Sequence, residues 1–306
     1  MAPGWGHVAA VTAAAQVVAA PPHVVREAVR LALAEDLGWG DVTTDALVPP
    51  DQPGRAVLVA KAPGVLCGLD AFAETFRQVD PGVCFDALLA DGDHVEPGTE
   101  VARLAGSAAS ILKGERVALN FVQRLSGTAT LTRRFADAVA GTRATIVDTR
   151  KTTPGLRALE KYAVRVGGGQ NHRMNLSDGV LIKDNHLAAV RNRGGGVADA
   201  VRRARAAAPH TIRVEVEVTT LAQVDEALQG EPDIILLDNM PLAVLGEAVK
   251  RVDGRALTEA SGGIRLETVR AVAEAGVDLI SVGALTHSAP SLDLSLELTL
   301  DAAGPR

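Results

Sequence analysis

The chain has 306 residues, 47% of them hydrophobic and 22% charged, with a formal net charge of −6. This composition suits a folded protein with a sizeable core and excludes disorder as its main state. The negative balance argues against a general nucleic-acid-binding protein, which needs a broad basic surface. No apolar run reaches the roughly 20 residues that cross a bilayer. We therefore expect neither nucleic acid nor a membrane among the partners.

Residues 1–22 are predicted to form a flexible tail. The stretch is rich in Ala and Val, but no Lys or Arg precedes Arg26, so the basic start of a secretory signal is missing. Cys67 and Cys84 have neither a metal-ligand spacing nor a disulfide pattern, and both are expected to be small buried side chains. These features favour a cytoplasmic location.

Residues 23–140 are predicted to form an α/β sandwich domain. Helical spacing of apolar residues and Asp-Gly and Pro-Gly turns define its elements. In chain order we expect a helix over 23–36, a polar turn at 41–45, a strand over 55–60, a helix over 69–79, antiparallel strands within 84–106, and a long helix or helix pair over 109–139, interrupted near Gly127.

Residues 141–287 follow another pattern, in which short apolar runs alternate with helical segments. The expected strands are 144–148, 179–184, 213–218, 233–238, 256–261 and 279–283. The expected helices are 155–165, 197–207, 220–228, 241–251 and 266–275. Such alternation predicts an α/β fold with a parallel sheet covered on both faces. We predict an incomplete, TIM-like β/α barrel, with a doubly wound open sheet as the alternative. Residues 288–306 are expected to return to the first domain.

Charged, hydroxyl or glycine residues follow every strand predicted in the second domain. Function gathers at the carboxyl ends of parallel strands, so we expect a ligand site there. The window 149–183 holds seven Lys and Arg residues against two acids, which indicates a small anionic ligand.

The cations of this window fall into two sets. Arg150 and Lys151 directly follow a strand, which favours a binding role. The other set, on a predicted helix, shares helical spacing with an acid and is expected on a solvated face: Arg157, Lys161 and Arg165, with Glu160.

A glycine-rich loop, 166–179, contains His172 and Arg173. Its three successive glycines allow the backbone to approach a ligand closely. Because the loop lies between two cationic strand ends, the last of them at Lys183, a binding role for His172 is favoured over that of a surface histidine.

Glycine turns end the last two predicted strands, at Ser261-Gly262-Gly263 and at Ser281-Val282-Gly283. Backbone amides at such turns bind anions, and the final two loops of a barrel often bind phosphate. We therefore expect a phosphate site there.

Carboxylates end two neighbouring predicted strands, at Glu217 and Asp238. Glu215 and Glu217 point to one side of their strand, because side chains alternate. These carboxylates would bind ribose hydroxyls, orient a metal-bearing phosphate or stabilise a developing cation; an ion pair with Lys183 or Lys151 is the structural alternative.

Several of these segments carry a family resemblance. They are EDLGWGDVTTDAL (35–47), GERVALNFVQRLSGTAT (114–130), DTRKTTPGLRALEKYAVRVGGGQNHRMNLSDGVLIKDNH (148–186), VEVEV (214–218), LLDNM (236–240), EASGGI (259–264) and VGALTHSAPSLDLSLEL (282–298). Together they resemble the quinolinate phosphoribosyltransferases (nicotinate-nucleotide pyrophosphorylase, carboxylating), a type II phosphoribosyltransferase family, from about residue 24 to residue 300.

The resemblance implies an open-faced α/β sandwich followed by an incomplete barrel, and a homodimer or higher oligomer whose subunits share each active site. The implied reaction joins quinolinate to phosphoribosyl pyrophosphate and yields nicotinate mononucleotide, pyrophosphate and CO2, a step of de novo NAD synthesis. Mg²⁺ would be bound mainly through phosphoribosyl pyrophosphate and water, without a protein metal site.

The resemblance also implies residue roles. The residues facing quinolinate are Arg150, His172, Arg173 and Lys183, with Arg116 of the partner subunit. Around the ribose and pyrophosphate it implies Lys151, Glu217 and Asp238, with Thr149 beside them. The 5′-phosphate would lie on Ser261, Gly262, Gly263, Ser281, Val282 and Gly283. The catalytic residues would be Lys151, Lys183, Glu217 and Asp238.

Other functions stay open at this point. The nearest is a nicotinate phosphoribosyltransferase or a molybdenum-associated relative of the same fold. A Schiff-base aldolase would use Lys183 in a desolvated pocket. An anion-binding barrel without turnover is the non-enzymatic alternative.

Overall fold

The structure, a computed structural model, describes residues 17–300. Most of the predicted tail lies outside this range. The described part of it, however, contacts the fold: the Val18 carbonyl accepts a hydrogen bond from Arg165 (2.7 Å), and Ala20 is buried beside Val25 and Val29. Helix α1 begins at Pro22.

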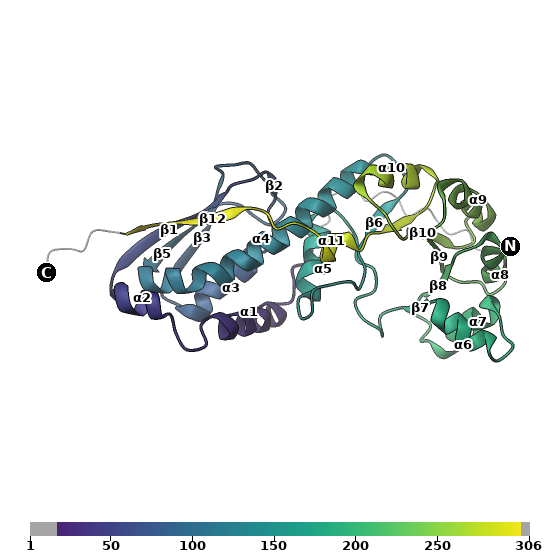
Figure 1. Ribbon diagram of the computed structural model, residues 1–306, viewed down its shortest axis with the longest axis horizontal. Helices are drawn as coiled ribbons and strands as arrows, with labels where there is room; N and C mark the ends of the chain where they lie inside the picture. Colours follow the sequence, from purple (N-terminus) through teal and green to yellow (C-terminus); the bar gives the residue numbers. More distant parts are fainter. Residues whose placement is uncertain (1–16, 301–306) are drawn as a thin grey trace.

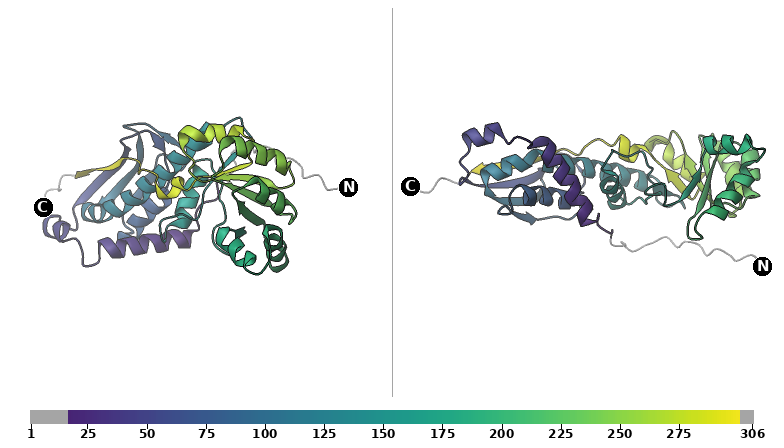
Figure 2. Two further views of the ribbon diagram at one scale, coloured as in Figure 1. Left: turned by 45° about the vertical axis from the view of Figure 1, so that its right-hand side comes forward. Right: turned by 90° about the horizontal axis from the view of Figure 1, so that it is seen from below.

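Two sheets at opposite ends of the long axis organise the molecule (Figures 1 and 2). The first is antiparallel, in the order β12-β1-β5-β3. Its strands are β1 (Pro53–Ala60), β3 (Cys84–Ala87), β5 (Glu100–Ser107) and β12 (Leu294–Leu300), and a small sheet pairs β2 (Gly64–Val65) with β4 (His94–Val95). The chain thus returns from the second sheet to the first, where β12 lies beside β1.

The helices of this first half are α1 (Pro22–Asp36), α2 (Val42–Leu47), α3 (Leu69–Val79) and α4 (Ala108–Ala138). One face of the sheet packs on α3 and α4 through a core that includes Phe72, Phe76 and Ile111. Exposed and buried residues alternate along the first half of β1, so the other face meets solvent. The predicted open-faced sandwich is confirmed.

Three local predictions are wrong in this half, the third of them in helix α4. The expected polar turn at 41–45 is helix α2, because Asp41 accepts hydrogen bonds from the backbone amides of Thr43 (3.1 Å) and Thr44 (3.0 Å) and caps a helix. Cys67 is buried as expected, but Cys84 is exposed on β3; both are free thiols.

Helix α4 is continuous over 31 residues and is not interrupted at Gly127. Glycine is required at position 127 for another reason. A Cβ there would lie 2.0 Å from the Pro290 carbonyl oxygen, so only glycine lets the returning chain cross the helix. Leu292 donates its amide hydrogen to the Gln123 carbonyl at this crossing (2.9 Å). Ile111 of α4 lies in the first core and Phe135 in the second, so the helix belongs to both halves (Figure 1).

The second sheet is parallel, in the order β6-β11-β10-β9-β8-β7. Its strands are β6 (Thr145–Val147), β7 (Val180–Ile182), β8 (Val214–Val218), β9 (Ile234–Asp238), β10 (Leu257–Ser261) and β11 (Leu279–Ser281). Its helices are α5 (Arg157–Val166), α6 (Asp184–Arg191), which was not predicted, α7 (Val197–Ala207), α8 (Leu221–Leu228), α9 (Leu242–Val252), α10 (Leu266–Glu274) and α11 (Ala284–His287).

This strand order decides between the two predicted architectures. From β7 the strands follow one another in chain order to β11, and β6 closes onto β11, without the reversal that a doubly wound sheet requires. The sheet is therefore a six-stranded barrel that stays open between β6 and β7, as predicted.

Candidate active site

The inner face of the barrel is charged. Val214, Val216 and Val218 of β8 pack in the outer core with the helices. Because side chains alternate along a strand, Glu215 and Glu217 point to the opposite, inner face. In β10 Ala260 likewise lies in the outer core, so Glu259 points inward. All six strands are parallel, so their carboxyl ends and these inner side chains meet in one region.

A buried ion pair lies under the loop 166–179. Asp148, at the end of β6, and Lys161, on α5, are both fully buried and bonded to each other. Asp148 also accepts hydrogen bonds from the His172 amide (2.9 Å) and from Asn171 Nδ2 (2.7 Å), and Lys161 Nζ donates to the His172 carbonyl (2.9 Å). Burial raises the pKa of Asp148 and lowers that of Lys161, while each charge opposes the shift of the other. The pair fixes the loop that carries His172.

A second buried carboxylate belongs to Glu160, beside Lys161 on α5. It accepts hydrogen bonds from Arg124 of α4 (3.0 Å) and from the amide and hydroxyl of Thr153 (2.9 and 2.7 Å). Arg124 also donates to the Ala289 carbonyl (2.9 Å) and so joins α4, α5 and the returning chain.

These contacts overturn the expectation of a solvated face on α5. Lys161 and Glu160 are fully buried. Arg157 donates to Thr152 Oγ1 (2.9 Å) and to the Met174 carbonyl (3.2 Å). The spacing of these charges is that of a surface helix, but their partners lie outside α5 and therefore cannot be inferred from the periodicity of the helix.

His172 lies against two buried glutamates. Its Nε2 is 3.0 Å from Glu215 Oε2 and 3.8 Å from Glu259 Oε2. Burial raises the pKa of Glu259 to about 8, and the negative charge of Glu215 adds to the shift. Burial lowers the pKa of His172, but the hydrogen bond to Glu215 and the negative charges of Glu215 and Glu259 together outweigh burial, so the net shift is upward. Glu259 was not predicted; its place two residues before Ser261 puts it on the inner face.

His172, Glu215 and Glu259 each offer one potential metal-ligand atom, and these three atoms lie within 4.8 Å of one another. By distance alone, the group could hold a metal ion. The ring orientation does not fit that use. His172 Nδ1 accepts a hydrogen bond from the Arg173 amide (2.7 Å), so Nε2 carries the proton of the neutral ring and has no lone pair for an ion. We therefore assign no metal to this group.

The predicted cations gather around this group. Arg173 donates to the Gly179 carbonyl (2.9 Å), and burial, together with the nearby charge of Arg150, lowers the pKa of its guanidinium group. Arg150 Nε is buried without a hydrogen-bond partner among the described residues. Arg150, Arg173 and Lys183, together with the neutral ring of His172, are called the cationic end below.

Two carboxylates line the mouth of the barrel. Glu217 accepts from Lys183 Nζ at 2.6 Å, the ion pair foreseen as the structural alternative. The Lys183 side chain is 46% exposed, unlike the desolvated lysine that a Schiff-base aldolase needs. Asp238 accepts from Asn239 Nδ2 (2.9 Å), and Asn239 takes a left-handed φ of 52°. Asn239 was missed, because a positive φ leaves no periodic pattern.

The predicted phosphate turns lie on neighbouring strands, and Ser261-Gly262-Gly263 with Ser281-Val282-Gly283 is called the glycine end below. Gly262 and Gly263 have φ of 90° and 61°, a region open to glycine. A Cβ on Gly262 would lie 2.3 Å from Asn239 Oδ1, and one on Gly283 would lie 3.1 Å from Lys151 Cδ. Lys151 therefore extends along the glycine end.

Thr149 and Ser281 complete the set. Thr149 Oγ1 accepts from the Lys151 amide (3.0 Å) and shapes the turn after β6, whereas Ser281 is buried beside Glu259 and Val282 belongs to the core. Behind Ser261-Gly262-Gly263 a cavity of about 230 Å³ is lined by apolar residues of α9 and α10.

Arg116 lies apart from the other predicted site residues. Its side chain is 61% exposed, on the part of α4 whose neighbours Ile111 and Ala118 pack in the first core. The chain by itself thus leaves Arg116 on the N-terminal half, away from the barrel strands.

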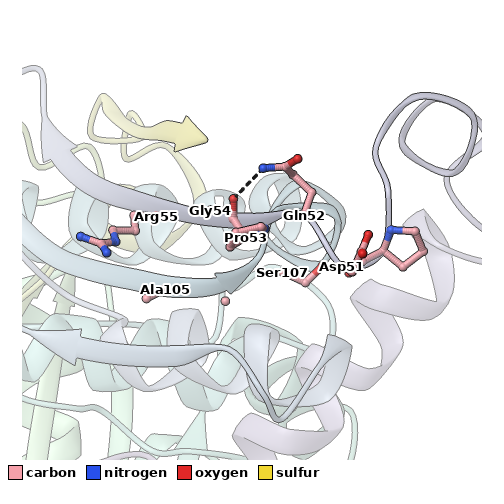
Figure 3. A pocket seen from close by; sticks show the side chains of 9 residues that line it. Asp51, Gln52, Pro53, Gly54, Arg55, Ala105 and Ser107 are labelled. Atoms are coloured by element: carbon pink, nitrogen blue, oxygen red, sulfur yellow. Dashed lines mark hydrogen bonds between the residues drawn. The ribbon is translucent and has the colours of Figure 1, made fainter. Parts of the chain in front are cut away.

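A second cavity, of about 470 Å³, lies at the edge of the first sheet, between the start of β1 and the end of β5 (Figure 3). Gln52 donates there to the Pro53 carbonyl (3.2 Å). The cavity contains none of the predicted site residues.

The sequence and the fold are similar to those of known proteins. The quinolinate phosphoribosyl transferase N-terminal domain matches residues 41–126 and the C-terminal domain matches residues 128–297. The chain is 47% identical over 279 residues to the nicotinate-nucleotide pyrophosphorylase [carboxylating] of Mycobacterium leprae (89% of this chain, 96% of the relative). It is 46% identical over 266 residues to the probable enzyme of the same name from Bacillus subtilis (87% and 90%). The structure of NadC from Streptococcus pyogenes superposes with a TM-score of 0.88 at 44% identity, covering 92% of this chain and 99% of that one.

An open six-stranded barrel with a cationic end and a glycine end defines the class of the protein, a phosphoribosyltransferase of the two-domain barrel type. The chain belongs to the quinolinate phosphoribosyltransferase family. The predicted family, fold and enzyme class, a decarboxylating pentosyltransferase, are confirmed. Within residues 17–300, no helix has the length and apolar character needed to cross a membrane.

Proposed function

We propose that the inner face of the barrel joins quinolinate to phosphoribosyl pyrophosphate and releases pyrophosphate and CO2, which gives nicotinate mononucleotide for de novo NAD synthesis. The observation that carries the proposal is the gathering of Arg150, Arg173 and Lys183 beside His172, with Arg150 Nε buried and without a hydrogen-bond partner among residues 17–300. A ligand with two adjacent carboxylates would satisfy this concentration of positive charge.

The two ends then bind different substrates. The cationic end binds the carboxylates of quinolinate, and the glycine end binds the 5′-phosphate through backbone amides. Lys151, which extends along the glycine end, binds phosphate or pyrophosphate oxygens. Glu217 and Asp238 accept hydrogen bonds from the ribose hydroxyls.

The reaction follows from this placement. As pyrophosphate leaves, positive charge develops on C1 of the ribose, and the carboxylates of Glu217 and Asp238 stabilise it. The ring nitrogen of quinolinate attacks C1. The nitrogen is then cationic and stabilises the electron pair that CO2 leaves on C2, and this carbon takes up a proton from water to give nicotinate mononucleotide. The cationic end therefore has mainly to orient the 2-carboxylate.

Mg²⁺ fits this site as a companion of the substrate. The carboxylates of Glu217 and Asp238 are partly committed to Lys183 and Asn239, which suits hydrogen bonds to the water shell of an ion carried by pyrophosphate oxygens. The ion would neutralise charge on the departing pyrophosphate.

The subunits share the site in this proposal. The exposed position of Arg116 supports its contribution to the barrel of a partner subunit, in a homodimer or a higher oligomer. The proposed location of the enzyme is the cytoplasm. Arg116→Ala and Lys183→Ala subunits, each inactive alone, should on random mixing regain up to roughly a quarter of the activity per site. Absence of recovery, with subunit exchange demonstrated, would contradict a shared site.

The activity is tested by the loss of quinolinate absorbance, which should require both phosphoribosyl pyrophosphate and Mg²⁺ and should release one CO2 per nicotinate mononucleotide. Nicotinate is the discriminating control. Its single carboxylate would leave buried cations unpaired at about 1–3 kcal/mol or more, so we expect discrimination of roughly 10- to 200-fold or greater. Comparable turnover of nicotinate would favour a nicotinate phosphoribosyltransferase instead, and absence of any turnover would favour a binding protein.

A further inference from the structure

The inner face of the barrel holds an acid pair that the reaction above does not use. Glu215 is 3% exposed and Glu259 is 1% exposed. Each has one carboxylate oxygen, Oε1, that is buried without a hydrogen-bond partner among residues 17–300. The other oxygens of both face the same atom, His172 Nε2, at 3.0 and 3.8 Å.

Two buried carboxylates this close cannot both be ionised without a large electrostatic cost. The groups that face Glu259 are Glu215 from β8, His172 from the loop, Lys183 at the end of β7 and the hydroxyl of Ser281 on β11. The positive groups only partly offset burial and the Glu215 charge. One proton carried by the pair would remove this repulsion.

The position of His172 links the pair to the cationic end. Its Nδ1 accepts a hydrogen bond from the Arg173 amide (2.7 Å), and its Nε2 donates to Glu215. The ring is therefore held between the acid pair and the backbone of Arg173, a residue predicted to bind quinolinate. An added negative charge on the pair would lie directly under the site of a dianionic substrate.

We propose that Glu215 and Glu259 are positioning residues that share one proton beneath His172 and thereby set both the orientation of this ring and the net charge under the bound quinolinate. The inference rests on the proposed function for the identity of the substrate, but not for the shared proton. The pair would affect substrate binding at the cationic end, because it carries one negative charge at neutral pH and two in alkali.

The first experiment follows the Michaelis constants of both substrates between pH 7 and pH 9. In the unmodified enzyme the KM for quinolinate should rise about tenfold as the second carboxylate ionises, whereas the KM for phosphoribosyl pyrophosphate changes little. Glu259→Gln keeps the shape of the protonated acid, so it should retain the neutral-pH KM within about threefold and lose the rise. Glu274→Gln, an exposed glutamate on α10 paired with Arg270, is the matched control and should retain the rise.

Glu215 tests the positioning role. Glu215→Gln keeps an oxygen that accepts from His172 Nε2 and should retain the neutral-pH KM, whereas Glu215→Met removes the acceptor and should raise the KM for quinolinate tenfold or more with little change for phosphoribosyl pyrophosphate. A thermal melt separates this effect from misfolding. Equal loss for both substrates in a folded Glu215→Met enzyme, or a rise with pH that persists in Glu259→Gln, would overturn the proposal.

The second experiment needs no substrate. Infrared difference spectra of the unmodified protein against Glu259→Gln should show the C=O stretch of a protonated carboxyl group at pH 7 and lose it by pH 9. A protein that turns over quinolinate but lacks this band would refute the shared proton alone. A protein that has the band but does not turn over quinolinate would refute the proposed function alone.

Discussion

The cationic end and the glycine end lie on the same barrel, but the first consists of side chains and the second mainly of backbone. At the cationic end the proposed ligand groups are side chains, and the buried charges nearby are Asp148 with Lys161, Glu160 with Arg124, and Glu215 with Glu259. At the glycine end the proposed binding surface is the backbone itself, shaped by left-handed turns at Gly262 and Gly263.

The difference teaches how each end fails. A side-chain site fails when a substitution leaves a buried charge without its partner, and the cost falls on folding as well as on binding. A backbone site fails when a Cβ occupies the path of the chain or the ligand, and the cost falls on binding at that end. Four substitutions or conditions test this contrast.

The largest effect is expected for Lys161→Met. The variant leaves Asp148 buried and unpaired, so the free energy of unfolding should fall by about 3–5 kcal/mol, measured by urea denaturation. Lys113→Met is the control, because the Lys113–Asp45 pair (2.6 Å) is partly exposed and should cost less than about 1 kcal/mol. Equal losses in the two variants would mean that burial does not distinguish these ion pairs.

Gly262→Val should act on the glycine end alone. Its Cβ would collide with Asn239 in a backbone conformation that valine rarely adopts. We expect the affinity for phosphoribosyl pyrophosphate to fall by an amount on the order of 2 kcal/mol, about 30-fold, with a smaller change for quinolinate. Gly246→Val on α9, where an added Cβ meets nothing within 4 Å, is the control. Loss of quinolinate binding only would reverse the two ends.

The pH dependence of the free energy of unfolding tests the buried acid pair beneath the cationic end. The pKa of Glu259 is raised from 4.5 to about 8, so the folded state binds a proton that the unfolded state releases. Stability from this group is fully present below pH 4.5 and is lost as the pH rises toward 8. The free energy of unfolding, measured by urea denaturation, should be lower at pH 8.5 than at pH 5, and Glu259→Gln should reduce this difference. An identical fall in the variant would rule out Glu259 as its source.

The smallest effect is expected for Asn239→Gly. Glycine accepts the left-handed φ, so the variant removes only the hydrogen bond to Asp238 and the contact with Gly262. We expect the KM for phosphoribosyl pyrophosphate to rise about threefold to fivefold, below about 1 kcal/mol, with the KM for quinolinate unchanged. An effect on quinolinate instead would tie Asn239 to the cationic end.

Much of the fold could be predicted from the sequence. The alternation of apolar runs and helical segments after residue 140 locates all six barrel strands, because a strand buried on both faces must be apolar throughout. The long apolar helix at 109–139 and the hairpin turns within 84–106 follow from the same local rules. Local rules failed where one side chain redirected the chain, as Asp41 does at the start of α2.

The sequence by itself also determined which residues end the strands, and hence which chemistry gathers at the carboxyl edge of the sheet. Only the tertiary structure decided how those residues are used. Lys161 and Glu160 have the spacing of a solvated helix face, yet both are buried, because their partners Asp148 and Arg124 come from other elements. Charge spacing reports neighbours along one helix, whereas burial and pKa depend on distances that close only when the chain folds. Glu259 became one of a pair for the same reason: parallel strands place it across the barrel from Glu215.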